Sequence, residues 1–311
     1  MRIALVDPSR TTRLIVGRML EAGGHDVLPF ADELEGLAQI KADHSIDALI
    51  TSAELKNISG VELCWEARLL ATCRRPIYVL MMSTQYDQRS LIEALDSGAD
   101  DFIGKPPLAE ELYARLRAAE RILSMQRDLL RLATTDPLTG LCNRRGFFER
   151  AIEACARAAT PDVSLSALIL DIDNFKHIND SYGHETGDEA IRACANAARL
   201  DEALTGRLGG DEFALLLERK SLPQAIEIAE DLRMRLAKKP FDTGKDRITL
   251  TWSVGVGEGR AGDTVDQILA RADAALYDAK LGGRNRVVGA HAGISTRPAV
   301  VTNGFARASS F

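Results

Sequence analysis

The sequence predicts two domains in tandem, first a doubly wound α/β domain and then an α+β domain. In roughly the first hundred residues, short apolar runs alternate five times with segments of helical periodicity, as in a parallel sheet covered on both faces. In the second half, a Gly-Gly pair lies between two apolar runs, which is typical of a β-hairpin. The 311 residues, 46% of them apolar, are enough for about two domains.

The first domain is expected over residues 1–106. Its strands are predicted at residues 3–6, 27–30, 46–51, 77–82 and 102–103. Its helices are predicted at residues 9–22, 32–43, 61–73, 87–97 and from 107 onward. Ligands of such sheets bind at the carboxyl ends of the strands, so those ends are candidate binding positions.

The run Gly98-Ala99-Asp100-Asp101-Phe102, followed by Lys105-Pro106, resembles the flavodoxin-like receiver domain of response regulators. That resemblance implies a phosphoacceptor aspartate after the third strand and an acidic pair after the first. Here Ser52 stands at the acceptor position, and Asp7 is followed by Pro8. A hydroxyl cannot form an acyl phosphate, and one carboxylate is a poor Mg²⁺ site. We therefore expect a degenerate receiver with no phosphoacceptor.

Two further receiver positions keep their family residue types. Ser83 and Lys105 match the switch hydroxyl and the phosphate-pairing lysine. With no acceptor present, Lys105 is expected to pair with Asp7 or to face solvent. Glu54 would reach the acceptor position only through a two-residue slip, which the strand length does not favour.

A connecting helix is expected over residues 107–133. Its candidate heptad seam consists of Leu112, Leu116, Ala119, Leu123, Gln126, Leu130 and Ala133. We interpret this seam as a stalk that joins two copies of the chain. The alternative is a helix that packs the same stripe on its own domain.

The Gly-Gly pair belongs to Arg207-Leu208-Gly209-Gly210-Asp211-Glu212-Phe213, which resembles the signature of the GGDEF family, the diguanylate cyclases. Gly-Gly-Asp-Glu also occurs in ordinary hairpins, but the other family motifs are present in the same order. They begin with Thr135-Asp136-Pro137-Leu138-Thr139-Gly140, which we interpret as mainly structural. The cyclase domain is expected over residues 134–289, and residues 290–311 are expected to form a disordered tail.

The resemblance implies a ferredoxin-like, palm-like fold for this domain. Strands are predicted at residues 166–172, at the signature hairpin, at 248–256 and at 286–288. Helices are predicted up to about residue 200 and at 222–238 and 264–280. We expect an antiparallel sheet with its helices on one side.

Asp171 ends one predicted strand and Asp211 lies on the hairpin, so the two carboxylates can face each other across the sheet. Hard divalent cations prefer such oxygen ligands. By resemblance, two Mg²⁺ (or Mn²⁺) ions are held by Asp171, the carbonyl of Ile172 and Asp211, with Glu212 adjoining. Asp211, Glu212 and Lys176 are the expected catalytic residues. A solvated acidic sheet edge is the alternative interpretation.

Residues for a guanine nucleotide also match the family. By resemblance, Asn179 and Asp188 recognise the guanine base, since a carboxylate can accept from its N1–H and amino groups. Lys176, Lys280 and Arg284 match the cations that hold phosphates. Gly209 and Gly210 carry no Cβ that would obstruct a phosphate.

The resemblance implies an enzyme that condenses two GTP into cyclic di-GMP, with release of two pyrophosphates, in a homodimer. The alternative is a catalytically weak module that senses GTP or docks a partner, and the receiver is also a possible docking site for a protein. The family's product-binding Arg-x-x-Asp is absent, because Leu200 and Ala203 occupy its charged positions. We therefore expect weak product inhibition.

Composition sets limits on partners and location. A net charge of −6 provides no basic patch of the size that nucleic acids require, so no nucleic acid partner is expected. No apolar run approaches the roughly 18 residues of a membrane helix, so no membrane insertion is expected. The first residues do not resemble a signal peptide. The five cysteines lack metal-ligand spacing, and we expect a bacterial cytoplasmic protein with free thiols.

Overall fold

The structure is a computed structural model that describes residues 1–71, 75–84, 88–158 and 164–290. The chain divides into two compact units, Met1–Arg131 and a second that begins at Leu132. Apart from Ala290, the predicted disordered tail lies outside the described residues.

The first unit contains a five-stranded parallel sheet in the order β2-β1-β3-β4-β5. Its strands are β1 (Arg2–Val6), β2 (Asp26–Phe30), β3 (Ala48–Ser52), β4 (Tyr78–Ser83) and β5 (Asp101–Gly104). Its helices are α1 (Arg10–Ala22), α2 (Glu33–Ala42), α3 (Gly60–Leu70), α4 (Gln88–Asp96) and α5 (Ala109–Thr134). The doubly wound α/β fold is confirmed.

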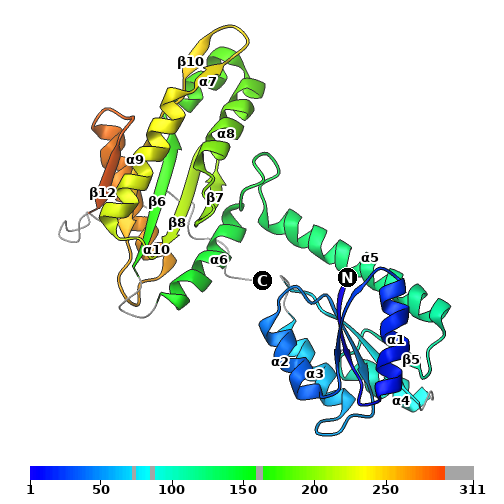
Figure 1. Cartoon of the computed structure of the whole chain (residues 1–311). Helices are drawn as coiled ribbons and strands as arrows, with labels where there is room; N and C mark the ends of the chain where they lie inside the picture. Colours follow the sequence, from blue (N-terminus) through cyan, green and yellow to red (C-terminus); the bar gives the residue numbers. More distant parts are fainter. Residues whose placement is uncertain (72–74, 85–87, 159–163, 291–311) are drawn as a thin grey trace. The chain divides into compact units, whose positions relative to one another are not determined.

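Two apolar cores sandwich this sheet. Side chains alternate between the faces of a strand, so neighbouring residues of β1 enter different cores. Ala4 and Val6 pack with residues of α2, α3 and α4, whereas Ile3 and Leu5 pack with residues of α1 and α5. Figure 1 shows α2 and α3 on one side of the sheet and α1 and α5 on the other. The carboxyl ends of β1, β3, β4 and β5 are thus held in fixed register.

Helix α5 corrects the predicted dimer seam. Leu112, Leu116, Ala119 and Leu123 are at most 2% exposed, because they pack in the core that α1 and the sheet form. The prediction that these four positions join two chains is therefore wrong, and the alternative of packing on the helix's own domain holds for them. A heptad pattern records which face is apolar, not which surface covers it.

The second unit contains a five-stranded sheet in the order β12-β11-β6-β8-β7. Its strands are β6 (Leu165–Ile172), β7 (Ala203–Gly209), β8 (Glu212–Glu218), β11 (Trp252–Glu258) and β12 (Val287–Ala290). A separate small hairpin is formed by β9 (Pro240–Asp242) and β10 (Arg247–Thr249). The central pairings are antiparallel as predicted, but β11 and β12 pair in parallel.

Helices cover both faces of this second sheet, which corrects the expectation of helices on one side. They are α6 (Arg144–Arg157), α7 (Phe175–Tyr182), α8 (His184–Ala198), α9 (Leu222–Lys238) and α10 (Val265–Leu281). Residues of α8 and α9 pack on one face, and residues of α6 and α10 pack on the other. Helix α6 was not predicted, because its buried contacts come from one Phe and small residues that give a weak apolar pattern.

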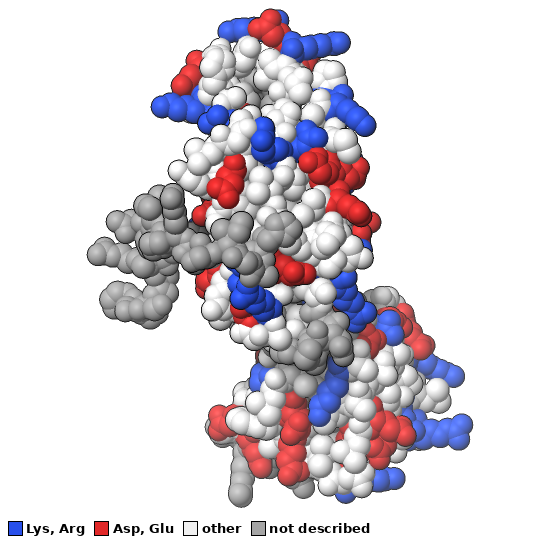
Figure 2. All heavy atoms as spheres, turned by 90° about the vertical axis from the view of Figure 1, so that its left-hand side faces the viewer, with Lys and Arg blue, Asp and Glu red and all other residues white. Residues whose placement is uncertain are grey.

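Within the described residues, no helix has both the length and the apolar character needed to cross a bilayer. The four cysteines in that part of the chain (Cys64, Cys142, Cys155 and Cys194) have free thiols. On the face that Figure 2 displays, basic and acidic side chains alternate without a continuous basic area.

Candidate active site

The signature hairpin forms as its sequence predicts. It joins β7 to β8, and Gly210 adopts a φ of +50°, a left-handed conformation that glycine tolerates without steric cost. The strand register shifts between Arg207 and Gly209. This irregularity re-aims the chain just before Asp211 and Glu212, as bulges near strand ends do.

The two acidic segments lie side by side. Strand β6 pairs with β8, and its Asp171 stands opposite Glu212 in the register. The backbone N–H of Ile172 donates to the carbonyl of Asp211 at 3.3 Å. The predicted approach of the β6 end to the hairpin is therefore confirmed, with Glu212 rather than Asp211 as the direct cross-strand neighbour of Asp171.

Lys280, in the last turn of α10, contacts this acidic group. Its Nζ lies 2.7 Å from Oδ2 of Asp171, and the two side chains are 35% and 13% exposed. Helix α10 packs against β6 and β11 through its buried face, which fixes this position. Arg284 lies four residues later in the exposed loop after α10, with a φ of +63°.

The electrostatics show negative charge that the protein compensates only in part. Burial raises the pKa of the Asp171 carboxyl; the Lys280 ammonium opposes that rise, and the carboxylates of Asp211 and Asp173 add to it. Partial desolvation and the nearby Asp171 charge raise the pKa of Glu212. Glu212 is an exposed residue, so the charge of Asp171 opposite it is the better supported cause.

The donor set fits a hard divalent cation. Asp171, Asp211, Glu212 and the carbonyl of Ile172 supply only oxygen, and their crowded charges would be relieved by a metal ion. Within the described residues, no three carboxylate, imidazole or thiolate groups are already gathered around one point. A metal would thus have to draw the hairpin acids together and share Asp171 with Lys280.

The residues predicted to recognise guanine lie on two neighbouring helices. Asn179 lies on α7, and a Cβ at Gly187 on α8 would be 1.9 Å from its Oδ1. Gly187 therefore lets α8 approach α7 closely, and Asp188 is the next residue along. Lys176 is exposed in the first turn of α7. Asp188 is exposed as well, as a residue that contacts a nucleotide needs to be.

Asp173 is a structural residue that the sequence did not single out. Its buried carboxylate accepts hydrogen bonds from Thr251, from Ser253 and from the backbone N–H of Asn285, at 2.8, 2.8 and 3.0 Å. It ties the end of β6 to the loop that carries Arg284. The Asp-x-Asp spacing with Asp171 was the available signal, since an alternate residue of a strand lies on the same face.

Arg207 was likewise missed as a brace of the hairpin. Its guanidinium donates to the carbonyl of Gly210 at 2.9 and 2.7 Å and pairs with Asp136 at 3.2 Å. Asp136 also accepts from the backbone and hydroxyl of Thr139. Asp136 therefore has a structural contact: it pairs with Arg207, which in turn holds the turn that carries Asp211.

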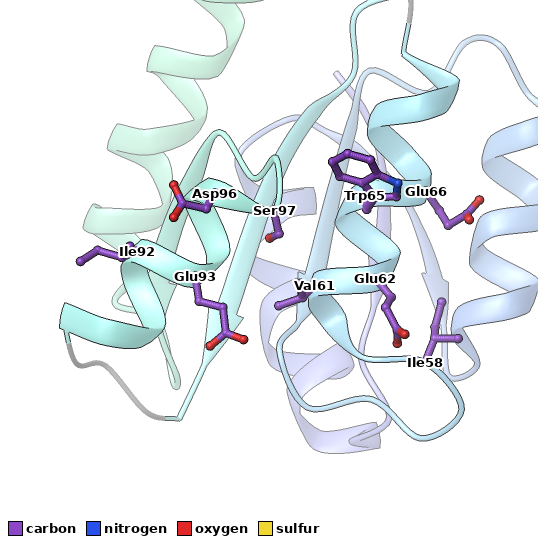
Figure 3. Close-up of a pocket in the computed structure, with 9 residues that line it drawn as sticks. All are labelled: Ile58, Val61, Glu62, Trp65, Glu66, Ile92, Glu93, Asp96 and Ser97. Carbon is purple, nitrogen blue, oxygen red and sulfur yellow. The ribbon is translucent and has the colours of Figure 1, made fainter.

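Two pockets among the described residues lie away from the acidic group of Asp171, Asp211 and Glu212. A pocket of about 480 Å³ beside the hairpin is lined by Asp136, Asn143, Arg144, Arg145, Arg207, Leu208, Gly209 and Gly210. A larger groove, about 1080 Å³, lies between α3 and α4 of the first unit. Figure 3 shows its lining, which includes Trp65 and four carboxylates. Size alone would therefore misplace the site.

Comparison with known proteins agrees with this geometry. The profile of the family described as diguanylate cyclase, GGDEF domain, matches residues 133–286, and that of the response regulator receiver domain matches residues 3–117. The coiled coil and GGDEF domain of DgcB from Caulobacter crescentus, solved in complex with c-di-GMP, is 34% identical. The match covers 58% of this chain and 99% of that one, with a TM-score of 0.54.

The chain belongs to the GGDEF family. The response regulator PleD of Caulobacter vibrioides is 36% identical over 267 residues, which are 81% of this chain and 58% of PleD. A diguanylate cyclase of Vibrio cholerae is 41% identical over 169 residues, 53% of this chain and 52% of that protein. The chain thus spans between half and three fifths of these curated relatives, and it joins a receiver domain to a GGDEF domain.

Proposed function

We propose that this chain is a diguanylate cyclase that condenses two GTP molecules into cyclic di-GMP and releases two pyrophosphates. The observation that carries the proposal is the meeting of Asp171, Asp211 and Glu212 across β6 and β8 with only partly compensated negative charge. Lys280 lies against this group, and Asn179 lies beside the residue that precedes Asp188.

In each of two equivalent steps, the 3′-oxygen of one GTP bonds to the α-phosphorus of the other and displaces pyrophosphate. Asp171, Asp211, Glu212 and the Ile172 carbonyl would hold two Mg²⁺ or Mn²⁺ ions per site, and these would neutralise charge on the phosphates and on the attacking oxygen. Glu212, which adjoins Asp211, is the residue that we assign to accept the proton of the attacking hydroxyl. Lys176, Lys280 and Arg284 hold the phosphates.

Guanine selectivity is assigned to Asn179 and Asp188. A carboxylate at position 188 can accept from the N1–H and the amino group of guanine, and adenine offers neither donor in that arrangement. A site built around such hydrogen bonds rejects a base that leaves them unmade. Gly187 keeps the two residues close, because any larger residue there would displace Asn179.

The direct test is Asp211→Asn, which removes one charge and keeps the shape of the hairpin. With GTP and Mg²⁺, wild-type protein is expected to form cyclic di-GMP, measured by chromatography, and to leave ATP unused. Loss of the charge should lower the rate by about three orders of magnitude, a typical size for lost electrostatic stabilisation. Asp201→Asn, an exposed acid at the other end of β7, is the matched control. Undiminished product from Asp211→Asn would remove the metal assignment. No product from wild type would favour the GTP-sensing or docking alternative.

Dimerisation is assigned to another face of α5. Ile122, Met125, Leu129 and Leu132 are 46–72% exposed and recur at spacings of three, four and three. That spacing is the a/d pattern of a two-stranded coiled coil. A two-fold product with one GTP per domain requires two domains face to face, so a second copy is the occupant we assign to this stripe.

This seam is tested with Met125→Glu combined with Leu129→Glu, because charges at a and d positions oppose coiled-coil pairing. The control is Ser124→Glu combined with Gln126→Glu, which adds the same charge at exposed positions beside the stripe. Analytical ultracentrifugation should show a monomer for the first variant and a dimer for the control, with activity lost on dilution only in the first. A dimer of unchanged affinity in both variants would exclude this face.

A further inference from the structure

The degenerate phosphorylation site of the receiver contains a carboxylate where none was expected. Glu54 follows β3 by two residues, and its Oε1 accepts hydrogen bonds from the Ser83 hydroxyl and the Thr84 hydroxyl, at 3.0 and 2.9 Å. The backbone N–H of Thr84 also donates to this oxygen, at 3.3 Å. One oxygen of Glu54 therefore joins the loop after β3 to the end of β4.

The second oxygen faces the ends of two more strands. Oε2 of Glu54 accepts from the Ser52 hydroxyl at 3.1 Å and lies 3.6 Å from Nζ of Lys105 after β5. Lys105 also donates to Ser52 and lies 2.7 Å from the buried Asp7 at the end of β1. The expected pairing of Lys105 with Asp7 is thus confirmed, but Glu54 shares the same ammonium group.

These donors form the usual surroundings of an oxyanion: one ammonium, three hydroxyls and one backbone N–H directed at two oxygens. No strand slip is needed to bring Glu54 there. The loop after β3 turns back so that the Ser52 hydroxyl accepts from the Glu54 backbone N–H and shares its single proton between Oε2 and the Glu54 carbonyl, the latter 2.9 Å away. Position 54 therefore reaches from the loop into the site that position 52 would have reached from the strand.

We propose that the receiver has an oxyanion-binding site at the ends of β3, β4 and β5 that is filled by its own Glu54 carboxylate. The side chain takes the place of an external phosphoryl group or other small oxyanion and holds the three strand ends in one arrangement. The site is consequently closed to phosphodonors. This inference does not depend on the cyclase activity.

Two substitutions of Glu54 separate this role from a simple loss of contacts. Glu54→Ala leaves a vacancy lined by all the donors, so formate, acetate or sulfate should bind there and restore stability by mass action. Glu54→Gln fills the same space but supplies one acceptor oxygen and places an amide near Lys105, so it should lose stability without gaining an anion site. Glu93→Ala, an exposed acid on α4, is the control.

The measurement is the thermal transition of the receiver unit in the full chain, with each anion compared with chloride at equal ionic strength. Glu54→Ala is expected to melt several degrees lower than wild type and to recover at least half of that loss in formate. Wild type, Glu54→Gln and Glu93→Ala should respond little to formate. A Glu54→Ala variant that is as stable as wild type, or that shows no larger formate response than Glu93→Ala, would overturn the proposal. A transition of wild type raised by beryllofluoride with Mg²⁺ would also overturn it, because the site would then be open.

Discussion

The two units of this chain each gather carboxylates and a lysine at the ends of neighbouring strands, and the two groups differ in how their charge is compensated. In the receiver, partial burial acts to raise the pKa of Glu54, but hydrogen bonds from Thr84 and Ser83 outweigh it and lower the pKa to about 2. In the GGDEF domain, burial and neighbouring acids raise the pKa values of Asp171 and Glu212.

The difference separates a structural acid from one that awaits a cation. Glu54 is surrounded by donors that the protein itself supplies, so its charge stabilises the fold. Asp171 has Lys280 and otherwise faces acids, so its charge is only partly compensated by the protein itself. The number of hydrogen-bond donors and cations around an acidic residue at a strand end, and not its position alone, therefore indicates whether its role is structural.

Arg207 holds the turn that carries Asp211 and Glu212 by donating to the backbone carbonyl of Gly210. The variant Arg207→Ala tests whether this contact matters for the rate. Removing the contacts to Gly210 and Asp136 should let the turn move, and displacement of catalytic groups by about 1 Å can cost about 100-fold in rate. We expect the rate of cyclic di-GMP formation to fall by about 10- to 100-fold, with a change in unfolding free energy of about 1 kcal/mol. The control Arg157→Ala removes an exposed pair with Glu218 at the opposite end of β8. Equal losses of rate in both variants would show that Arg207 has no special role.

Lys280→Met tests whether the lysine and the metal compete for Asp171. The variant removes the ammonium 2.7 Å from Asp171, so the carboxylate should bind Mg²⁺ more readily. We expect a fall of about 3- to 10-fold in the Mg²⁺ concentration that gives half of the maximal rise in the melting temperature of the GGDEF domain. This change is equivalent to about 1 kcal/mol. The KM for GTP should rise at the same time, because a phosphate contact is lost. A higher Mg²⁺ requirement would mean that Lys280 helps to assemble the metal site.

Acidification should change the contributions of these carboxylates to the stability of the two units in opposite directions. The folded pKa values of Asp171 and Glu212 lie above their ordinary values of 3.8 and 4.5, so their ionised forms destabilise the metal-free domain and the cost is relieved as pH falls through the raised values. Glu54 has a folded pKa of about 2 against an ordinary 4.5. Its contribution is present above pH 4.5 and is lost between pH 4.5 and about 2.

Calorimetry in the presence of a metal chelator would measure this contrast. At each pH, the thermal transition of wild type is compared with that of a variant that lacks the carboxylate. As pH falls through the raised pKa of Asp171 towards its ordinary value of 3.8, wild type should gain on Asp171→Asn in the transition of the second unit, because that variant has no such charge to lose. Below pH 4.5, the first unit of wild type should lose its advantage over Glu54→Ala. Parallel pH curves for wild type and Asp171→Asn would show that Asp171 is already compensated by Lys280.

The sequence by itself indicated the doubly wound receiver sheet, the antiparallel pairing of the central GGDEF strands and the signature hairpin, but not helix α6 or the helices on both faces of the second sheet. The alternation of apolar runs and helical segments indicated the doubly wound sheet because it reports local geometry and burial. The Gly-Gly turn indicated the β7–β8 hairpin that carries Asp211 and Glu212, since hairpin pairing is a short-range consequence of turn chemistry. The pairing that sets Glu212 opposite Asp171 of β6 is long-range. The Asn179 and Asp188 positions followed from motif order.

Only the tertiary structure decided which partner each of these groups has. The stripe of Leu112, Leu116, Ala119 and Leu123 is equally apolar whether it faces another chain or its own sheet, and packing settled it for the sheet. The contacts of Arg207 with Asp136, of Asp173 with Asn285 and of Glu54 with Ser83 join residues 71, 112 and 29 positions apart, so no local pattern records them. Strand spacing alone did not favour Glu54 at the receiver site, because a flexible loop can carry a side chain to a place that a strand register excludes.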